Sequence, residues 1–153
     1  MNKSTLAFLV ALGGVVAGCI NQETNLYEVA LSGRIDVAGG FPTTGEVHLE
    51  FHHAESIGTG ELAHPLGEFD RQTVASPGLT TQTLLYPIDE GSGLIVYGWL
   101  DADGDGVLCA PGKPRTEPAG LVLVSGFPAH ALTYRLVLTK ECAGPESFYP
   151  AQH

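Results

Sequence analysis

Apolar residues recur at every second position in several short stretches beyond residue 26, which is the period of a β-strand with one buried face. In the first stretch Val29, Leu31, Gly33, Ile35 and Val37 share one face, and polar residues occupy the other. No amphipathic helical pattern of ten or more residues occurs there. The alternation predicts about seven strands, near residues 29–37, 46–52, 68–74, 79–86, 94–100, 121–124 and 132–138.

The stretch 94–100 is apolar on both faces, which is typical of a central strand that is buried from both sides. The stretch 46–52 alternates apolar residues with Glu and His, and it predicts a strand with one wet face. One sheet alone would leave its apolar face in water, so two sheets must pack face to face. We therefore expect an all-β, two-sheet antiparallel sandwich over residues 27–142, with a C-terminal tail at 143–153.

The first 18 residues have a different pattern. Lys3 and the free amine give a positive start, and Leu6 to Val16 is an uncharged run of eleven residues. As a helix this run would span about 16 Å, short of the ~30 Å hydrocarbon core of a bilayer. The segment is therefore expected to be the helix of a cleaved signal peptide rather than a membrane-spanning helix.

The run ends in Val16-Ala17-Gly18-Cys19, which resembles the lipobox of bacterial lipoproteins. The resemblance implies that Cys19 becomes the first mature residue and carries acyl chains, and that residues 19–26 are a lipidated tether. Two or three acyl chains anchor a protein far more firmly than one. The resemblance also implies a bacterial cell envelope, and Ile20 in the place of an Asp favours the outer membrane.

Charge narrows the classes of partner. The chain has 153 residues, with 7 Lys and Arg against 17 Asp and Glu, and a formal net charge of −10. Removal of residues 1–18 takes away only Lys3 among the charged residues, so the mature chain would be slightly more acidic still. Such a surface repels a phosphate polymer, which argues against nucleic-acid binding. Cations and basic partners are its natural counterparts.

A short acidic motif carries the most specific chemistry. Asp101, Asp103 and Asp105 alternate with small residues, and Gly104 and Gly106 allow the tight coiling that would turn three carboxylates inward. The spacing matches the first part of a calcium-binding loop. The alternative is a plain tight turn, since Asp and Gly are preferred turn residues.

The rest of the motif departs from a helix–loop–helix calcium site. Gly112 occupies the position of the usual bidentate Glu, and the flanks are predicted to be strand and Pro-rich loop. The carbonyl of Val107 would be the next ligand, and Glu117 is the nearest carboxylate that could complete the shell. Calcium is therefore the one cofactor that the sequence suggests, at a weak site.

The same segment carries a second resemblance. A strand with Tyr97, followed by Asp-x-Asp-Gly-Asp-Gly and a stretch with Gly and Pro, is similar to secreted bacterial prealbumin-like or Ig-like sandwich domains. The similarity covers residues 88–120, about a quarter of the mature chain. It implies a sandwich fold and a non-catalytic module.

Two cysteines remain besides Cys19. Cys109 and Cys142 are expected to pair as a disulfide, because two thiols in an oxidising compartment usually do. His48 and His52 lie on one face of a strand about 13 Å apart, too far to share an ion, and are expected to be solvated or lightly packed.

No nucleophile elbow, phosphate-binding loop or convergent catalytic set is found in the sequence. The first hypothesis is thus a membrane-anchored envelope lipoprotein that acts as a non-catalytic binding or structural module, with calcium stiffening its acidic loop. A small-ligand or carbohydrate binder that uses Trp99, Tyr97 and the acidic loop is the alternative. An envelope hydrolase with a site built from distant residues ranks third.

Overall fold

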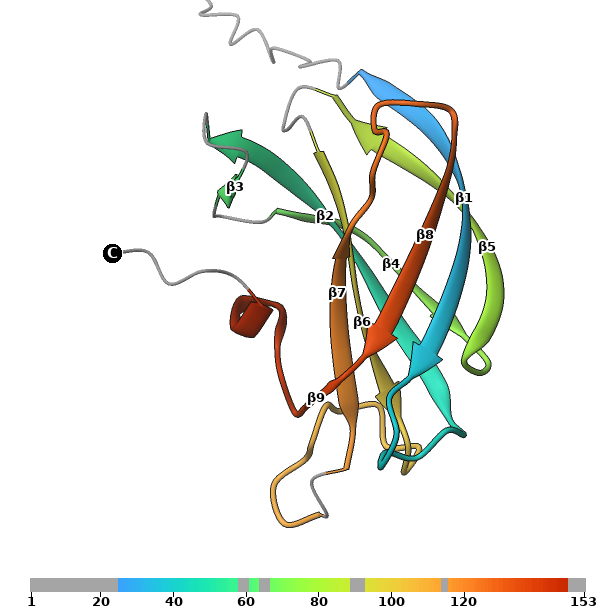
Figure 1. The fold of residues 1–153 in the computed structure, drawn as a ribbon, viewed down its shortest axis with the longest axis vertical. Coiled ribbons are helices and arrows are strands. Elements are labelled where there is room, and N and C mark those ends of the chain that lie inside the picture. Colours follow the sequence, from blue (N-terminus) through green and yellow to red (C-terminus); the bar gives the residue numbers. More distant parts are fainter. Residues whose placement is uncertain (1–24, 58–60, 64–66, 89–92, 114–115, 149–153) are drawn as a thin grey trace, which may run out of the picture.

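Two β-sheets pack face to face in the computed structural model, which describes residues 25–57, 61–63, 67–88, 93–113 and 116–148 (Figure 1). The predicted two-sheet sandwich is confirmed. The predicted signal peptide, Cys19 and most of the tether lie outside the described residues.

The smaller sheet has three strands, in the order β5 (Gly78–Pro87), β1 (Leu26–Val37) and β8 (Ala131–Leu138). The larger sheet has the order β3 (Glu61–Ala63), β2 (Glu46–Ile57), β6 (Gly93–Asp101), β7 (Pro118–Leu123) and β9 (Lys140–Glu141), and β4 (Glu68–Val74) also pairs with β2. The 3-10 helix η1 (Pro145–Phe148) follows β9. All seven predicted strands are present, and β3 and β9 are short additions.

The strand pairs are antiparallel except for β1 and β8, which run parallel from Ala30 opposite Ala131 to Val37 opposite Leu138. This exception follows from the connection after β7, which carries the chain from the larger sheet to the smaller one (Figure 1). The end of β8 then lies against β7, where the Thr139 N–H donates to the Ala119 carbonyl oxygen at 2.9 Å. A Cβ on Gly120 would lie 2.3 Å from the Val137 carbonyl oxygen, so this approach requires glycine.

The main core lies between the sheets and is built from the alternate residues that the period-two pattern predicted. In β8, for example, every second residue is buried. The largest fully buried side chains of this core come from five strands: Leu31, Ile35, Leu49, Phe51, Leu84, Tyr86, Leu94, Leu100, Leu136 and Leu138.

Strand β6 is buried on both faces, as predicted. Its second face is covered by a smaller cluster that contains Tyr97, Trp99, Ala119 and Ala143, with Phe148 of η1 packed against it. The Tyr97 hydroxyl donates to the Ala143 carbonyl oxygen at 2.8 Å. The segment 143–148, which was expected to be part of a tail, is therefore packed on the larger sheet.

Candidate functional site

The acidic loop begins where β6 ends, and one buried carboxylate organises it. Asp101 Oδ1 accepts hydrogen bonds from the backbone N–H groups of Gly104 and Asp105, and Oδ2 accepts one from Gly106, at 2.7, 3.2 and 2.8 Å. Gly104 and Gly106 have φ angles of 75° and 74°, as the predicted coiling requires. Three donors from one turn thus point at a single side chain.

These donors also keep Asp101 ionised. Burial works to raise the pKa of the Asp101 carboxyl, since the residue is only 4% exposed. The backbone N–H groups of Gly106, Gly104 and Asp105 together outweigh burial, and the pKa lies below its usual value.

Four carboxylates meet at this loop. Asp101, Asp103, Asp105 and Glu117 each offer an oxygen, and these oxygens lie within 4.8 Å of one another. Asp101 and Glu117 are buried, while Asp103 and Asp105 are exposed. Glu117 reaches the cluster because β6 and β7 pair antiparallel, which returns the start of β7 to the end of β6. The structure therefore brings together the three Asp residues and the Glu that the sequence singled out.

Glu117 also connects the cluster to the disulfide. Its carboxylate accepts hydrogen bonds from the N–H groups of Ala102, at 3.3 Å, and of Cys109, and its carbonyl oxygen accepts one from the Cys142 N–H at 2.9 Å. Cys109 and Cys142 form a disulfide with their Cα atoms 5.5 Å apart. Burial, helped by the nearby Asp103 and Asp101, raises the pKa of Glu117 against the effect of its two donors.

A lysine that the sequence reasoning missed closes the exposed side of the loop. Lys113 Nζ lies 3.0 Å from Asp103 Oδ2 and 2.7 Å from Asp105 Oδ2. The hydrogen bond from Lys113 holds the pKa of Asp105 below its usual value, and that from Asp105 raises the pKa of Lys113. The sequence does contain a signal for this contact, because Lys113 is a basic residue close to the three aspartates.

His48 is a second residue that spacing along the chain does not connect to the loop. Its Nε2 atom lies 3.7 Å from Asp101 Oδ2, and its ring stacks on Trp99 with centroids 4.3 Å apart and planes 11° from parallel. Both contacts follow from the pairing of β2 with β6, which places His48 opposite Trp99. Trp99 is only 7% exposed, so in this structure its ring is not available to a ligand in the way that the carbohydrate-binding alternative needs.

The strand histidines were expected to be solvated or lightly packed, and for His52 this was wrong. His52 and His53 are each 4% exposed. His52 Nε2 lies 3.2 Å from Glu50 Oε2, and Arg71 of β4 contacts the other oxygen of Glu50 at 3.2 Å while it bonds Glu68. His52 is buried because β4 pairs alongside β2 and brings Arg71 over this face. His53 points to the other face, where its ring lies against Phe69 and Tyr86.

The carboxylate cluster fits a calcium ion in the chemistry of its donors. Ca²⁺ takes six to eight oxygens at 2.3–2.6 Å, so two oxygens on opposite sides of the ion lie about 4.8 Å apart. Each Asp101 oxygen has further lone-pair capacity beside its N–H donors. Val107 donates its N–H to Asp105 Oδ1 at 2.8 Å, and its carbonyl remains a predicted ligand. Lys113 would have to release Asp103 and Asp105 for an ion to enter.

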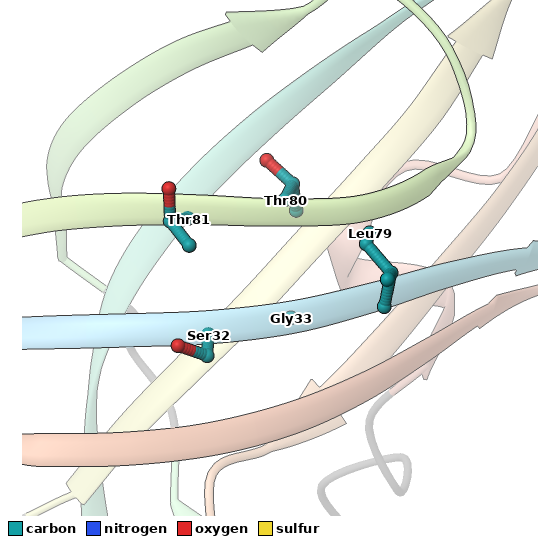
Figure 2. Close-up of a pocket in the computed structure, with 5 residues that line it drawn as sticks. All are labelled: Ser32, Gly33, Leu79, Thr80 and Thr81. Atoms are coloured by element: carbon teal, nitrogen blue, oxygen red, sulfur yellow. The ribbon is translucent and has the colours of Figure 1, made fainter.

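A pocket of about 310 Å³ lies elsewhere, over β1 and β5, and is lined by Ser32, Gly33, Leu79, Thr80 and Thr81 (Figure 2). Its lining offers hydroxyl groups and one leucine, and no acid, base or thiol.

No helix in the described part of the chain is both long and apolar enough to cross a bilayer. Comparison of the chain with models of known protein families, with curated proteins and with solved structures finds no match. The roles of the acidic loop therefore rest on its own chemistry and contacts.

Proposed function

We propose that this protein is anchored by lipid in a bacterial cell envelope, where it acts as a non-catalytic binding or structural module. In this proposal a calcium ion stiffens one end of its sandwich. The lipid anchor is supported by the uncharged run and the Val16–Cys19 motif. The calcium site is supported by one observation above all, which is the convergence of four carboxylates, two of them buried.

A cation would have a clear physical effect at this loop. Four carboxylates face one ammonium group, so mutual repulsion remains among the Asp and Glu side chains. An ion coordinated by Asp103 and Asp105 would bind the exposed half of the loop to the buried half at Asp101 and Glu117. The loop would then present a stiffer surface at this end of the sandwich.

Calcium is expected to raise the melting temperature of the protein, because a ligand that binds only the folded state stabilises it. A site with a dissociation constant of about 0.1–1 mM would give a rise of several degrees at 10 mM calcium. The measurement is thermal unfolding by circular dichroism of the full protein in detergent, with calcium and with chelator. An unchanged midpoint would remove the calcium proposal.

Two variants sharpen this experiment. Asp103→Ala removes an exposed ligand and should abolish the rise in the midpoint. Lys113→Ala removes the competing ammonium and should enlarge the rise at low calcium, because the ion no longer has to displace it. A smaller response in Lys113→Ala would contradict the competition between Lys113 and the ion.

Replacing Cys19 with alanine is expected to remove the protein from the membrane fraction and to abolish its labelling by palmitate, since the thiol is the proposed point of attachment. The matched control is the double variant Cys109→Ser, Cys142→Ser, which should remain labelled. The measurement is the amount of protein, and of palmitate label on it, in the membrane fraction of the cells. Labelled Cys19→Ala would contradict the anchor.

A further inference from the structure

Strand β5 is the outermost strand of the smaller sheet and lies at one margin of the molecule (Figure 1). Its even-numbered residues bond toward β1, as the hydrogen bond from the Ile88 N–H to the Asn25 carbonyl continues beyond the strand. The odd-numbered residues point their backbone groups away from β1, since the Thr83 carbonyl oxygen accepts a hydrogen bond from the Gln72 side chain of β4 at 3.3 Å.

The sequence of β5 itself lacks the usual protection against pairing, although the Gln72 side chain of β4 covers its outer side at Thr83. Edge strands normally carry charges, prolines or bulges that keep other chains from adding to the sheet. The ten residues of β5 include no charged residue, its register with β1 is unbroken, and its one proline is the last residue. By contrast, the edge strand β4 of the larger sheet carries Glu68, Asp70 and Arg71.

The side chains on the outer face of β5 read the same in both directions. In order they are Leu79, Thr81, Thr83 and Leu85, and all four are exposed, with Leu79 and Leu85 at 85% and 55%. Figure 2 shows Leu79 and Thr81 at one end of this row. The row therefore presents a leucine to solvent at each end and two threonines between them.

We propose that β5 is the contact between two copies of this protein, which join edge to edge as antiparallel strands about a two-fold axis at Gln82. In this register Leu79 of each copy pairs with Leu85 of the other, and Thr81 pairs with Thr83. All four pairs consist of residues whose backbone groups point outward, so every pair can exchange two hydrogen bonds. The two smaller sheets become one sheet of six strands. The bond from Gln72 to Thr83 is given up to the new strand.

The charged residues that flank the strip do not oppose a second copy at this register. Leu79 lies beside Arg34, and Leu85 lies beside Glu28, on the neighbouring strand β1. The two-fold axis places Arg34 of one copy in the same row as Glu28 of the other, on either side of the leucine pair. The net charge of the protein is negative, and β5 itself adds no charge to the contact between two copies.

The contact does not depend on the acidic loop or on the lipid anchor. It does set how two anchored copies would lie, because β1 runs in opposite directions in the two.

Disulfide trapping in cells tests the pairing and its register together. Two differently tagged full-length chains are expressed together, one with Thr81→Cys and one with Thr83→Cys. Their Cα atoms would be about 5.5 Å apart, within the range that a disulfide spans. We expect a reducible product that carries both tags after mild oxidation. When both chains carry Thr81→Cys, or both carry Thr83→Cys, the yield of the cross-linked product should be at least tenfold lower than for the mixed pair.

Two controls separate the pairing from random collision. Thr133→Cys lies exposed on β8 of the same outer face, away from the edge, and should not form the product with itself or with Thr83→Cys. Leu79→Lys, added to both trapping chains, should reduce the product at least tenfold while leaving the thermal midpoint close to that of its parent. Absence of the mixed product, equal trapping at Thr133, or a product with a different protein would each overturn the proposal.

Discussion

Replacing Asp101 with alanine is expected to lower the free energy of unfolding by about 3 kcal/mol, even in the absence of calcium. The substitution removes the acceptor of three backbone hydrogen bonds, from Gly104, Asp105 and Gly106. Hydrogen bonds to an ionised group are the stronger kind, and three of them are lost together. Urea unfolding in the presence of chelator measures the change.

Asp103→Ala is the matched comparison for this prediction. Asp103 bears the same charge in the same loop, but it is exposed and its ion pair with Lys113 is at the surface. Surface pairs contribute roughly 0–1 kcal/mol, so the calcium-free stability of Asp103→Ala should stay within about 1 kcal/mol of the parent. Equal losses in the two variants would mean that Asp101 does not organise the turn.

The same hydrogen bonds predict how the difference depends on pH. The folded-state pKa of Asp101 lies below the value of about 4 expected in the unfolded chain. Its contribution is therefore present above the unfolded pKa and is lost as the pH falls through the folded pKa. The gap in stability between the parent and Asp101→Ala should be full at pH 6 and should shrink below pH 4.

Loss of the disulfide is expected to cost about 3–4 kcal/mol of stability, because Cys109 and Cys142 are 33 residues apart and the bridge restricts a long segment of the unfolded chain. The double variant Cys109→Ser, Cys142→Ser in urea unfolding measures the loss. Reductant should lower the stability of the parent to that of the variant and leave the variant unchanged. A loss below about 1 kcal/mol would contradict the prediction.

The same variant should also respond less to calcium. Glu117 accepts a hydrogen bond from the Cys109 N–H through its side chain and one from the Cys142 N–H through its carbonyl. Without the bridge, the backbone at Cys109 is free to move away from Glu117, and one of the two buried carboxylates of the cluster loses its position. The rise in midpoint with calcium should therefore be smaller than in the parent.

The seven longer strands could be predicted because burial of one face leaves a period of two in the sequence. The predicted segment 68–74 has the same bounds as β4 in the structure, and 94–100 lies within β6. Strands β3 and β9 could not be predicted, since three and two residues are too few to show a period. The parallel pairing of β1 with β8 depends on a crossing between sheets, which periodicity does not record.

The candidate site likewise contains some residues that could be predicted from the sequence and some that could not. Asp101, Asp103 and Asp105 were identified from their spacing, because a tight turn brings together residues that are close in the sequence. Gly104 and Gly106 indicated that the chain turns there. Lys113 and His48 were missed because their contacts depend on how a loop folds back and on which residue of β2 lies opposite Trp99.

By itself, the amino-acid sequence determined the alternation that makes this chain a sandwich, the turn that gathers three aspartates, and the uncharged run that precedes Cys19. Each is a property of residues a few positions apart, where backbone geometry acts directly. Only the tertiary structure decided that Glu117 joins the aspartates, that His52 is buried beneath a salt bridge, and that β5 is the end strand of its sheet. Those outcomes depend on which strands become neighbours, and many strand orders satisfy the same period of two.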